Sequence, residues 1–150
     1  MAGTGDLIRA LLPPPEVDLA HVVRDDEAFA ATVAAAGEFL DPGLESAAFW
    51  LGGGRSYRGL DGFRRMWLDW LEPWATYHVE VEAILEEDDR VVVLIRDRGR
   101  HPGSDAEVEL LAGSVWTVRA GKVTRVELYA NREELFEASG FSPPGSPPRG

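Results

Sequence analysis

Cysteine is absent from the 150 residues of the sequence, which excludes disulfides, thiol nucleophiles and thiolate metal sites. The three histidines, His21, His78 and His101, lack a paired spacing such as H-x-x-x-H, so no metal site is expected. No apolar run approaches the length of a bilayer span, and roughly the first thirty residues lack the cationic start and apolar core of a secretory signal. We therefore expect a cytoplasmic protein that does not enter a membrane.

Positive charge is also scarce, with 15 lysines and arginines against 26 aspartates and glutamates and a net charge of -11. This balance repels phosphate backbones and anionic membranes, so neither nucleic acid nor a membrane is an expected partner. The glycines at 52–54 carry no Gly-Lys-Ser/Thr ending, and no serine occupies a Gly-x-Ser-x-Gly elbow. The sequence therefore offers neither a phosphate loop nor a serine triad, and no cofactor is expected.

Both ends of the sequence are predicted to be peripheral. Residues 1–16 contain a short amphipathic piece, and Pro13, Pro14 and Pro15 follow it; they fix φ and remove three N–H donors, which indicates an extended linker. Residues 142–150 are almost entirely proline, serine and glycine, a composition typical of a disordered tail. The expected domain is therefore 17–141, with 1–16 as an N-terminal extension.

The first half of this domain reads as helical. Acidic residues at 25–27 favour a helix start, and the pattern predicts a helix over 28–40 that stops at Asp41-Pro42-Gly43. After a glycine loop at 52–54, a second helix is predicted from about residue 60 to Pro73. Its apolar residues recur at spacings of three, four and seven, so they share one face: Phe63, Trp67, Trp70, Leu71 and Trp74.

From Tyr77 onward the hydrophobic period changes to two, which predicts four strands over 77–85, 91–98, 107–119 and 123–130. On the third strand an apolar face is formed by Val108, Leu110, Ala112, Ser114, Trp116 and Val118. Asn131 and Glu134 form a capping box for a short last helix that Gly140 ends. Helices followed by an antiparallel meander with one apolar face predict an α+β fold in which the helices cover that face.

Four motifs then occur in order. Residues 57–64 (YRGLDGFR) resemble the YRG-x-x-G-x-R entry to the long helix of nuclear transport factor 2-like, SnoaL-like domains. Residues 88–93 (DDRVVV) resemble that family's strand entry, and 115–123 (VWTVRAGKV) resemble its VWT-x-x-x-GK-V hairpin. The closing Y-x-x-R-E…G pattern is matched by Tyr129, Arg132, Glu133 and Gly140. The resemblance covers about residues 25–141.

This resemblance, which includes the polyketide cyclase and ketosteroid isomerase-like fold, implies a cone-shaped domain. A curved, mixed or antiparallel sheet would wrap around the N-terminal helices and enclose an open-ended apolar pocket, with a short C-terminal helix. Many members are homodimers joined through the sheet. The fold hosts isomerases, cyclases, epoxide hydrolases, transporters and non-catalytic binders, so the resemblance does not imply a reaction.

The catalytic acids of enzyme members are not found at the matching positions. Ketosteroid isomerase-like members carry an acidic oxyanion donor where this sequence has Ser114, and a base where it has residues 49–51. Epoxide hydrolase-like members need an inward aspartate, and the count gives Leu128 instead. These three departures weigh against an enzyme.

Three weaker catalytic candidates stay open. Asp97 lies between Arg96 and Arg98, and strand parity sends either the aspartate or the arginines inward; flanking guanidinium groups would lower its pKa, so a strand-end salt bridge is favoured. Glu45 lies in a segment that borders the cavity in relatives, although a solvated glutamate is the simpler interpretation. Tyr57 would offer a phenol at the rim.

The preferred hypothesis is a small-molecule-binding SnoaL-like protein without an assignable catalytic set, although the same aromatic residues would also suit a plain core. One alternative is an acid–base enzyme of the polyketide cyclase or isomerase type, using Glu45 or Asp97 with Tyr57 or Ser114. Another is a dimerisation module whose tryptophans fill its own cavity. The predicted ligand pocket consists of Trp50, Phe63, Trp67, Trp70, Trp74, Ser114, Trp116 and Leu128.

A homodimer is expected through the outer face of the last two strands. Charges of both signs alternate there along Glu107, Glu109, Arg125, Glu127 and Tyr129, which suits a self-complementary contact. A solvated face with cross-strand ion pairs is the alternative. The resemblance favours the dimer.

Overall fold

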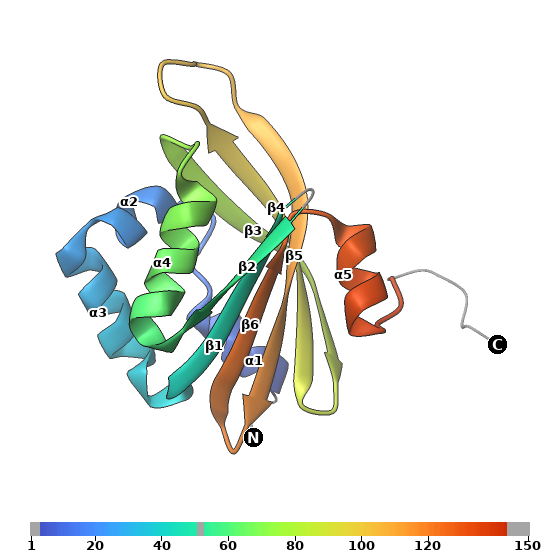
Figure 1. Ribbon diagram of the computed structural model, residues 1–150. Helices are drawn as coiled ribbons and strands as arrows, with labels where there is room; N and C mark the ends of the chain where they lie inside the picture. Colours follow the sequence, from blue (N-terminus) through green and yellow to red (C-terminus); the bar gives the residue numbers. More distant parts are fainter. Residues whose placement is uncertain (1–3, 51–52, 144–150) are drawn as a thin grey trace.

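The computed structural model describes residues 4–50 and 53–143, which form a curved six-stranded sheet with helices on both faces (Figure 1). The helices are α1 (Thr4–Leu11), α2 (Leu19–Arg24), α3 (Asp26–Ala36), α4 (Gly59–Leu71) and α5 (Arg132–Ser139), with a 3-10 turn at Gly37–Phe39. The strands are β1 (Leu40–Trp50), β2 (Gly53–Arg58), β3 (Thr76–Glu87), β4 (Arg90–Arg100), β5 (Val108–Arg119) and β6 (Lys122–Tyr129).

The strand order is β2-β1-β6-β5-β4-β3, with β1 parallel to β6 and every other pair antiparallel. Helices α2, α3 and α4 lie over one face, here called the inner face, and α5 lies on the outer face (Figure 1). The predicted α+β fold, with a curved mixed sheet, N-terminal helices and a short C-terminal helix, is confirmed. In the described ranges, no helix is both long and apolar enough to cross a bilayer.

Strand alternation separates the two faces as the sequence predicted for β5. Ala112, Ser114 and Trp116 are buried on the inner side, whereas Leu111, which directly precedes Ala112, is half exposed. On the neighbouring strand β4, Val93 and Ile95 belong to the same inner core. The period of two therefore assigned these side chains to the correct face.

The first half of the domain contains strands that the sequence analysis missed. Helix α3 ends at Ala36, and β1 begins at Leu40 and runs through Pro42. The register of β1 is irregular between Leu40 and Glu45, so the proline falls where ladder pairing is interrupted. The predicted loop at 52–54 is also wrong for Gly53 and Gly54, which start β2, while Gly52 lies outside the described residues. Pairing with both β2 and β6 explains why this segment is a strand.

A bulge in β3 changes which residues face inward. The register with β4 shifts between Val81 and Ala83, so the strict alternation predicted for 77–85 holds only as far as Val81. Ile84 then packs against the inner core, and Ala83 and Leu85 pack against the cluster beneath α5. The sequence contained no glycine or proline that would have marked this bulge.

Helix α5 packs closely on the outer face. The Asn131 side chain accepts a hydrogen bond from the Glu134 N–H at 3.1 Å, which confirms the predicted N-cap, and Gly140 has a φ of 80° at the C-cap. Under the helix, a Cβ on Gly113 would lie 2.6 Å from Leu135 Cδ1, so glycine permits the close approach. Leu135 is fully buried there.

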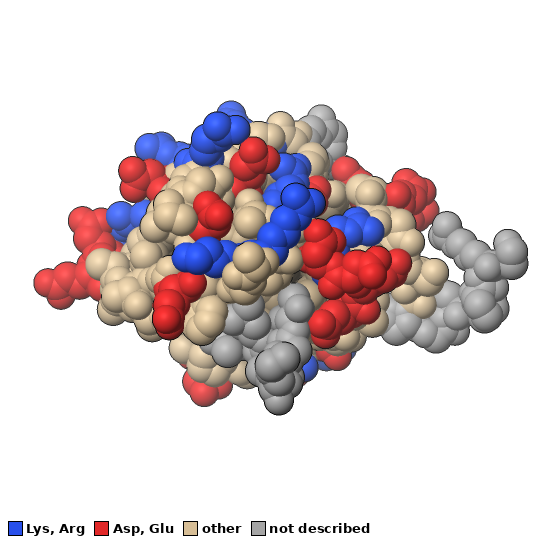
Figure 2. Space-filling view, turned by 90° about the horizontal axis from the view of Figure 1, so that it is seen from below, with Lys and Arg blue, Asp and Glu red and all other residues tan. Residues whose placement is uncertain are grey.

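Charges of both signs occur together on the surface. Seen from below, lysine and arginine side chains lie among aspartates and glutamates (Figure 2). Ion pairs such as Arg119–Asp89, at 3.2 Å, account for part of this mixture. Although acidic residues outnumber basic ones, arginines such as Arg119 have a carboxylate as a direct neighbour.

Candidate functional site

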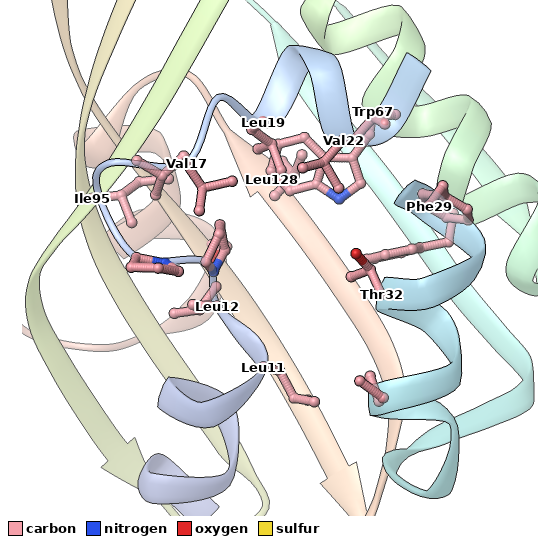
Figure 3. Close-up of a pocket in the computed structure, with 18 of the residues that line it drawn as sticks. Leu11, Leu12, Val17, Leu19, Val22, Phe29, Thr32, Trp67, Ile95 and Leu128 are labelled. Carbon is pink, nitrogen blue, oxygen red and sulfur yellow. The ribbon is translucent and has the colours of Figure 1, made fainter. Parts of the chain in front are cut away.

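A cavity of about 520 Å³ lies between the inner face of the sheet and the helices (Figure 3). The sheet contributes Val79, Ile95 and Leu128, and α4 contributes Trp67. Helices α2 and α3 form a second wall, and residues 11–14 at the end of α1 form a third. Three layers that are distant in the sequence therefore enclose one apolar space.

Among the described lining residues, the side chains with hydrogen-bonding groups are Thr32, Ser114, Trp67 and Trp116. Trp116 Nε1 donates to Ser114 Oγ at 2.8 Å, which occupies a lone pair of the serine and leaves its hydroxyl proton for another acceptor. Thr32 Oγ1 donates to the Ala28 carbonyl at 2.9 Å, so its oxygen can still accept. The cavity is thus apolar with a small number of polar groups, as ligand pockets commonly are.

Helix α3 presents an apolar surface that the protein itself does not cover. None of its residues, all of which are described, is buried, although the segment is mainly alanine, valine and phenylalanine. Ala31, Thr32 and Ala35 are exposed and line the cavity, and Phe29 lines it from the same helix. A helix of a folded protein normally buries its apolar side against other residues. Because the apolar side of α3 is not buried, it borders a space that can be occupied.

The predicted pocket residues divide into three groups. Those that line the main cavity are Phe63, Trp67, Ser114, Trp116 and Leu128. Trp70 and Trp74 line a second cavity of about 490 Å³ at the other end of α4. The side chain of Trp50 lies outside the described residues. The helical spacing placed the tryptophans on one face but could not divide that face between two cavities.

Trp70 and Trp74 also have structural roles. Trp70 Nε1 donates to the Tyr77 hydroxyl at 3.0 Å. Trp74 stacks on His101 with ring centroids 4.3 Å apart, and its ring lies so close to Gly99 that a Cβ there would be 2.4 Å from it. These contacts fix the position of the tryptophans independently of any ligand.

Asp97 is fully buried and faces inward. The Tyr77 hydroxyl donates a short hydrogen bond to Asp97 Oδ2, while Oδ1 has no hydrogen-bond partner among the described residues. Burial raises the pKa of Asp97 to about 7, against the lowering effects of Tyr77 and Arg132. Burial next to this carboxyl likewise raises the pKa of the Tyr77 phenol.

The expectation of a lowered pKa for Asp97 was therefore wrong. Arg96 and Arg98 point to the outer face, where Arg96 pairs with Glu82 at 3.1 Å and Arg98 with Glu107 at 3.9 Å. The expected salt bridge between Asp97 and these arginines is therefore also wrong, because both arginines pair with glutamates instead. Adjacent residues of a strand point to opposite faces, so Arg96 and Arg98 do not lie next to the carboxyl group of Asp97.

Glu45 and Tyr57 lie away from the main cavity. Glu45 accepts hydrogen bonds from Arg58 at 3.2 Å and Arg125 at 3.1 Å on the partly exposed edge formed by β1 and β2. The Tyr57 hydroxyl donates to Asp69 at 2.5 Å, and burial together with this carboxylate raises the pKa of Tyr57 to about 12. The structure does not bring Glu45, Asp97 and Tyr57 together.

Two parts of the site escaped the sequence analysis. Tyr77, the partner of Asp97, was recognised only as a strand start, although a phenol six residues after the end of the tryptophan-rich helix α4 was a usable signal. The residues at 11–14 were assigned to a peripheral extension, whereas Ile8 is fully buried and Leu11 and Leu12 line the cavity. A triple proline indicated an extended segment but not what the segment covers.

The curved mixed sheet that encloses a cavity with its helices defines the nuclear transport factor 2-like cone fold. The chain belongs to the SnoaL-like domain family, which it matches over residues 17–126. No curated protein matches the sequence.

Solved structures resemble the fold at low identity. A protein from Jannaschia sp. CCS1, named for its likeness to SnoaL-like polyketide cyclases, is 19% identical with a TM-score of 0.63, over 92% of each chain. TerC, co-crystallized with polyporic acid, is 20% identical with a TM-score of 0.58, over 79% of this chain and 88% of its own. A ketosteroid isomerase-like protein from Catenulispora acidiphila DSM 44928, in complex with trimethylamine, is 14% identical with a TM-score of 0.56, over 90% of this chain and 100% of its own. These likenesses show the fold alone.

Proposed function

We propose that the protein binds a small, largely apolar molecule in the main cavity. The observation that carries this proposal is the uncovered apolar side of α3, which borders a space of about 520 Å³. A ligand that covered Phe29, Ala31 and Ala35 would remove apolar surface from water, which is favourable in proportion to the area. TerC with polyporic acid and the Catenulispora protein with trimethylamine support small-molecule binding by this fold.

The polar groups of the cavity favour a ligand with one hydrogen-bond acceptor near Ser114. The serine proton is not used in the bond with Trp116, so it can donate to a ketone, ester or ether oxygen. Thr32 lies on the α3 wall of the cavity and can accept from a ligand hydroxyl (Figure 3). A carbonyl compound with an extended apolar body fits these groups.

Binding can be tested with N-phenyl-1-naphthylamine, a neutral probe whose fluorescence rises in apolar surroundings. We expect saturable binding that Ala35→Phe abolishes, because the added ring enters the cavity from α3. Ala34→Phe is the matched control, since Ala34 is exposed on the same helix and does not line the cavity. No saturable binding by the unmodified protein, or equal loss in both variants, would contradict the proposal. Native mass spectrometry of the purified protein would identify a retained ligand.

Acid–base catalysis by Asp97 is a second candidate, favoured by a buried carboxyl with a pKa of about 7. Its neighbours on the sheet, Val79 and Ile95, line the main cavity, but Asp97 itself is not among the lining residues. The test is hydrogen–deuterium exchange next to the carbonyl of cyclohexanone, followed by NMR. Exchange that rises with an apparent pKa near 7 and disappears in Asp97→Asn would support catalysis. Exchange equal to that of buffer would remove this candidate.

We also propose a homodimer through the outer face of β5. Leu111 is 50% exposed on this face, among ion pairs of Arg96 and Arg98 with glutamates. An apolar centre with a charged rim suits a two-fold contact. Sedimentation of the unmodified protein should give a dimer, and Leu111→Arg should give a monomer, whereas Arg119→Glu, outside this patch, should not. A monomer at all concentrations would exclude the dimer.

A cytoplasmic location stays a prediction.

A further inference from the structure

We propose that residues 8–15, here called the N-terminal strap, set the size of the molecule that the main cavity accepts. This inference rests on the proposed ligand binding and adds a determinant of specificity to it. The strap lies before residue 17, where the match to the SnoaL-like family begins. The wall that it forms therefore lies outside the part of the chain that matches the family model.

The side chains of the strap complete the cavity. Ile8 has no exposed surface and belongs to the inner core, which fixes the strap to the sheet. Leu11, Leu12, Pro13 and Pro14 then line the cavity. Leu11 and Leu12 lie across the cavity from Thr32 on α3 (Figure 3). Their length determines how far a ligand can extend from Ser114 and Trp67 toward the end of α1.

The backbone of the strap suits an apolar wall. Its prolines have no N–H donors, so they place no unsatisfied donor beside an apolar ligand. The Pro14 carbonyl accepts from the Val17 N–H at 3.0 Å, and the Pro15 carbonyl lies 3.1 Å from His78 Nδ1. The Arg9 carbonyl accepts from the Leu12 N–H at 3.3 Å. These carbonyl groups are therefore already bonded within the protein.

The strap is held at both ends. On one side the Gly5 N–H donates to Glu86 at 3.2 Å, and on the other the Asp18 carboxylate accepts from the Tyr77 N–H at 2.9 Å. Consecutive prolines between these attachments restrict φ, so the wall yields little to a ligand that is too long. We infer that the leucine side chains, and not movement of the chain, define the length limit.

Displacement of N-phenyl-1-naphthylamine by 1-alkanols of increasing chain length measures this limit. For the unmodified protein, affinity should rise with each methylene and then stop rising at one length. Leu12→Ala and Leu11→Ala should move that break to longer alcohols, with about tenfold tighter binding of the first alcohol beyond the original break. Leu12→Phe should move it to shorter alcohols.

Leu110→Ala is the matched control, because it removes the same atoms from the second cavity and should leave the break unchanged. Thermal unfolding of each variant shows that it is folded, and the opposite shift in Leu12→Phe separates size selection from general loosening. Unchanged breaks in all the Leu11 and Leu12 variants, or an equal shift in Leu110→Ala, would overturn the role of the strap while leaving ligand binding intact. If the unmodified protein does not bind the probe at all, the proposed function and the strap hypothesis both fail.

Discussion

The two faces of the sheet are stabilised in different ways. On the outer face, α5 packs Leu135 and Phe136 against Val92, Leu94 and Val115, and arginine–carboxylate pairs surround this cluster. On the inner face, the helices enclose a cavity and leave one side of α3 uncovered. Close packing on the outer face keeps the sheet in shape, whereas the inner face leaves a cavity under the helices. We call the closely packed outer face the structural side and, in line with the proposed function, the inner face with its cavity the binding side.

The largest expected effect on the free energy of unfolding concerns the buried carboxyl of Asp97 on the inner face. The pKa of Asp97 rises from 3.8 to about 7 on folding, which corresponds to roughly 4 kcal/mol. Between those pH values the folded protein holds a proton that the unfolded chain has released, so its free energy of unfolding falls as pH rises. Asp97→Asn removes this titration. Relative to Asp97→Asn, the unmodified protein should therefore lose up to about 4 kcal/mol between pH 4 and pH 8.

Urea unfolding of both proteins across this pH range measures the difference. The other acidic residues titrate in both proteins, so their contribution cancels. Glu45→Gln, which removes a carboxylate from the partly exposed sheet edge, is the matched control. Parallel pH curves for the unmodified protein and Asp97→Asn would show that the carboxyl is not held protonated.

The next prediction compares one buried leucine from each face. Leu135 is 0% exposed in the packed outer cluster, and Leu128 is 2% exposed on the wall of the cavity. Leu135→Ala should cost about 4 kcal/mol, because it creates a new cavity in a close-packed region. Leu128→Ala should cost about 2 to 3 kcal/mol, because its side chain already borders an open space and makes fewer contacts there. Chemical denaturation gives both values, and equal costs would show that the inner face is as closely packed as the outer one.

The second half of the fold could be predicted from the sequence because its signals are local. Ala112, Ser114 and Trp116 alternate with outward residues, and Asn131 and Gly140 mark the ends of α5. Strand β1 could not be predicted in this way. Its pairing with β2 and β6 overrides Asp41-Pro42-Gly43, and such tertiary pairing leaves no periodic signal in the segment itself.

The candidate site was only partly predictable for the same reason. Ser114, Trp116 and Leu128 follow from strand parity, and Trp67 follows from helical spacing. The bond between Tyr77 and Asp97 joins two strands, and Leu12 reaches the cavity only after the chain folds back over the sheet. Contacts between residues that are far apart in the sequence leave no local pattern. The alternation along β4 showed that Asp97 and its flanking arginines face opposite ways, but not which of them faces inward.

A smaller effect is expected at the arginine that links β4, β5 and the bulge in β3. Arg132 donates to the Ile95 carbonyl at 2.9 Å and to the Ala112 carbonyl at 3.1 Å, and it pairs with Glu82. Arg132→Gln should lower the free energy of unfolding by about 2 kcal/mol, as bonds from charged donors to partly buried carbonyls are lost. Arg96→Gln, which loses a more exposed pair with the same Glu82, should cost less than about 0.5 kcal/mol. Equal costs in urea unfolding would show that the carbonyl contacts of Arg132 contribute nothing.

The smallest effect should occur where the outer edge of the sheet meets solvent. The side chains of Arg58 and Glu45 are 79% and 47% exposed, and Glu45 keeps Arg125 as a partner when Arg58 is removed. Arg58→Gln should therefore change the free energy of unfolding by less than about 0.5 kcal/mol, and added salt should reduce even this change. A loss above about 1 kcal/mol that disappears in high salt would show that ion pairs hold β2 against β1. In that case the sheet edge, and not only the cluster under α5, would belong to the structural side of the molecule.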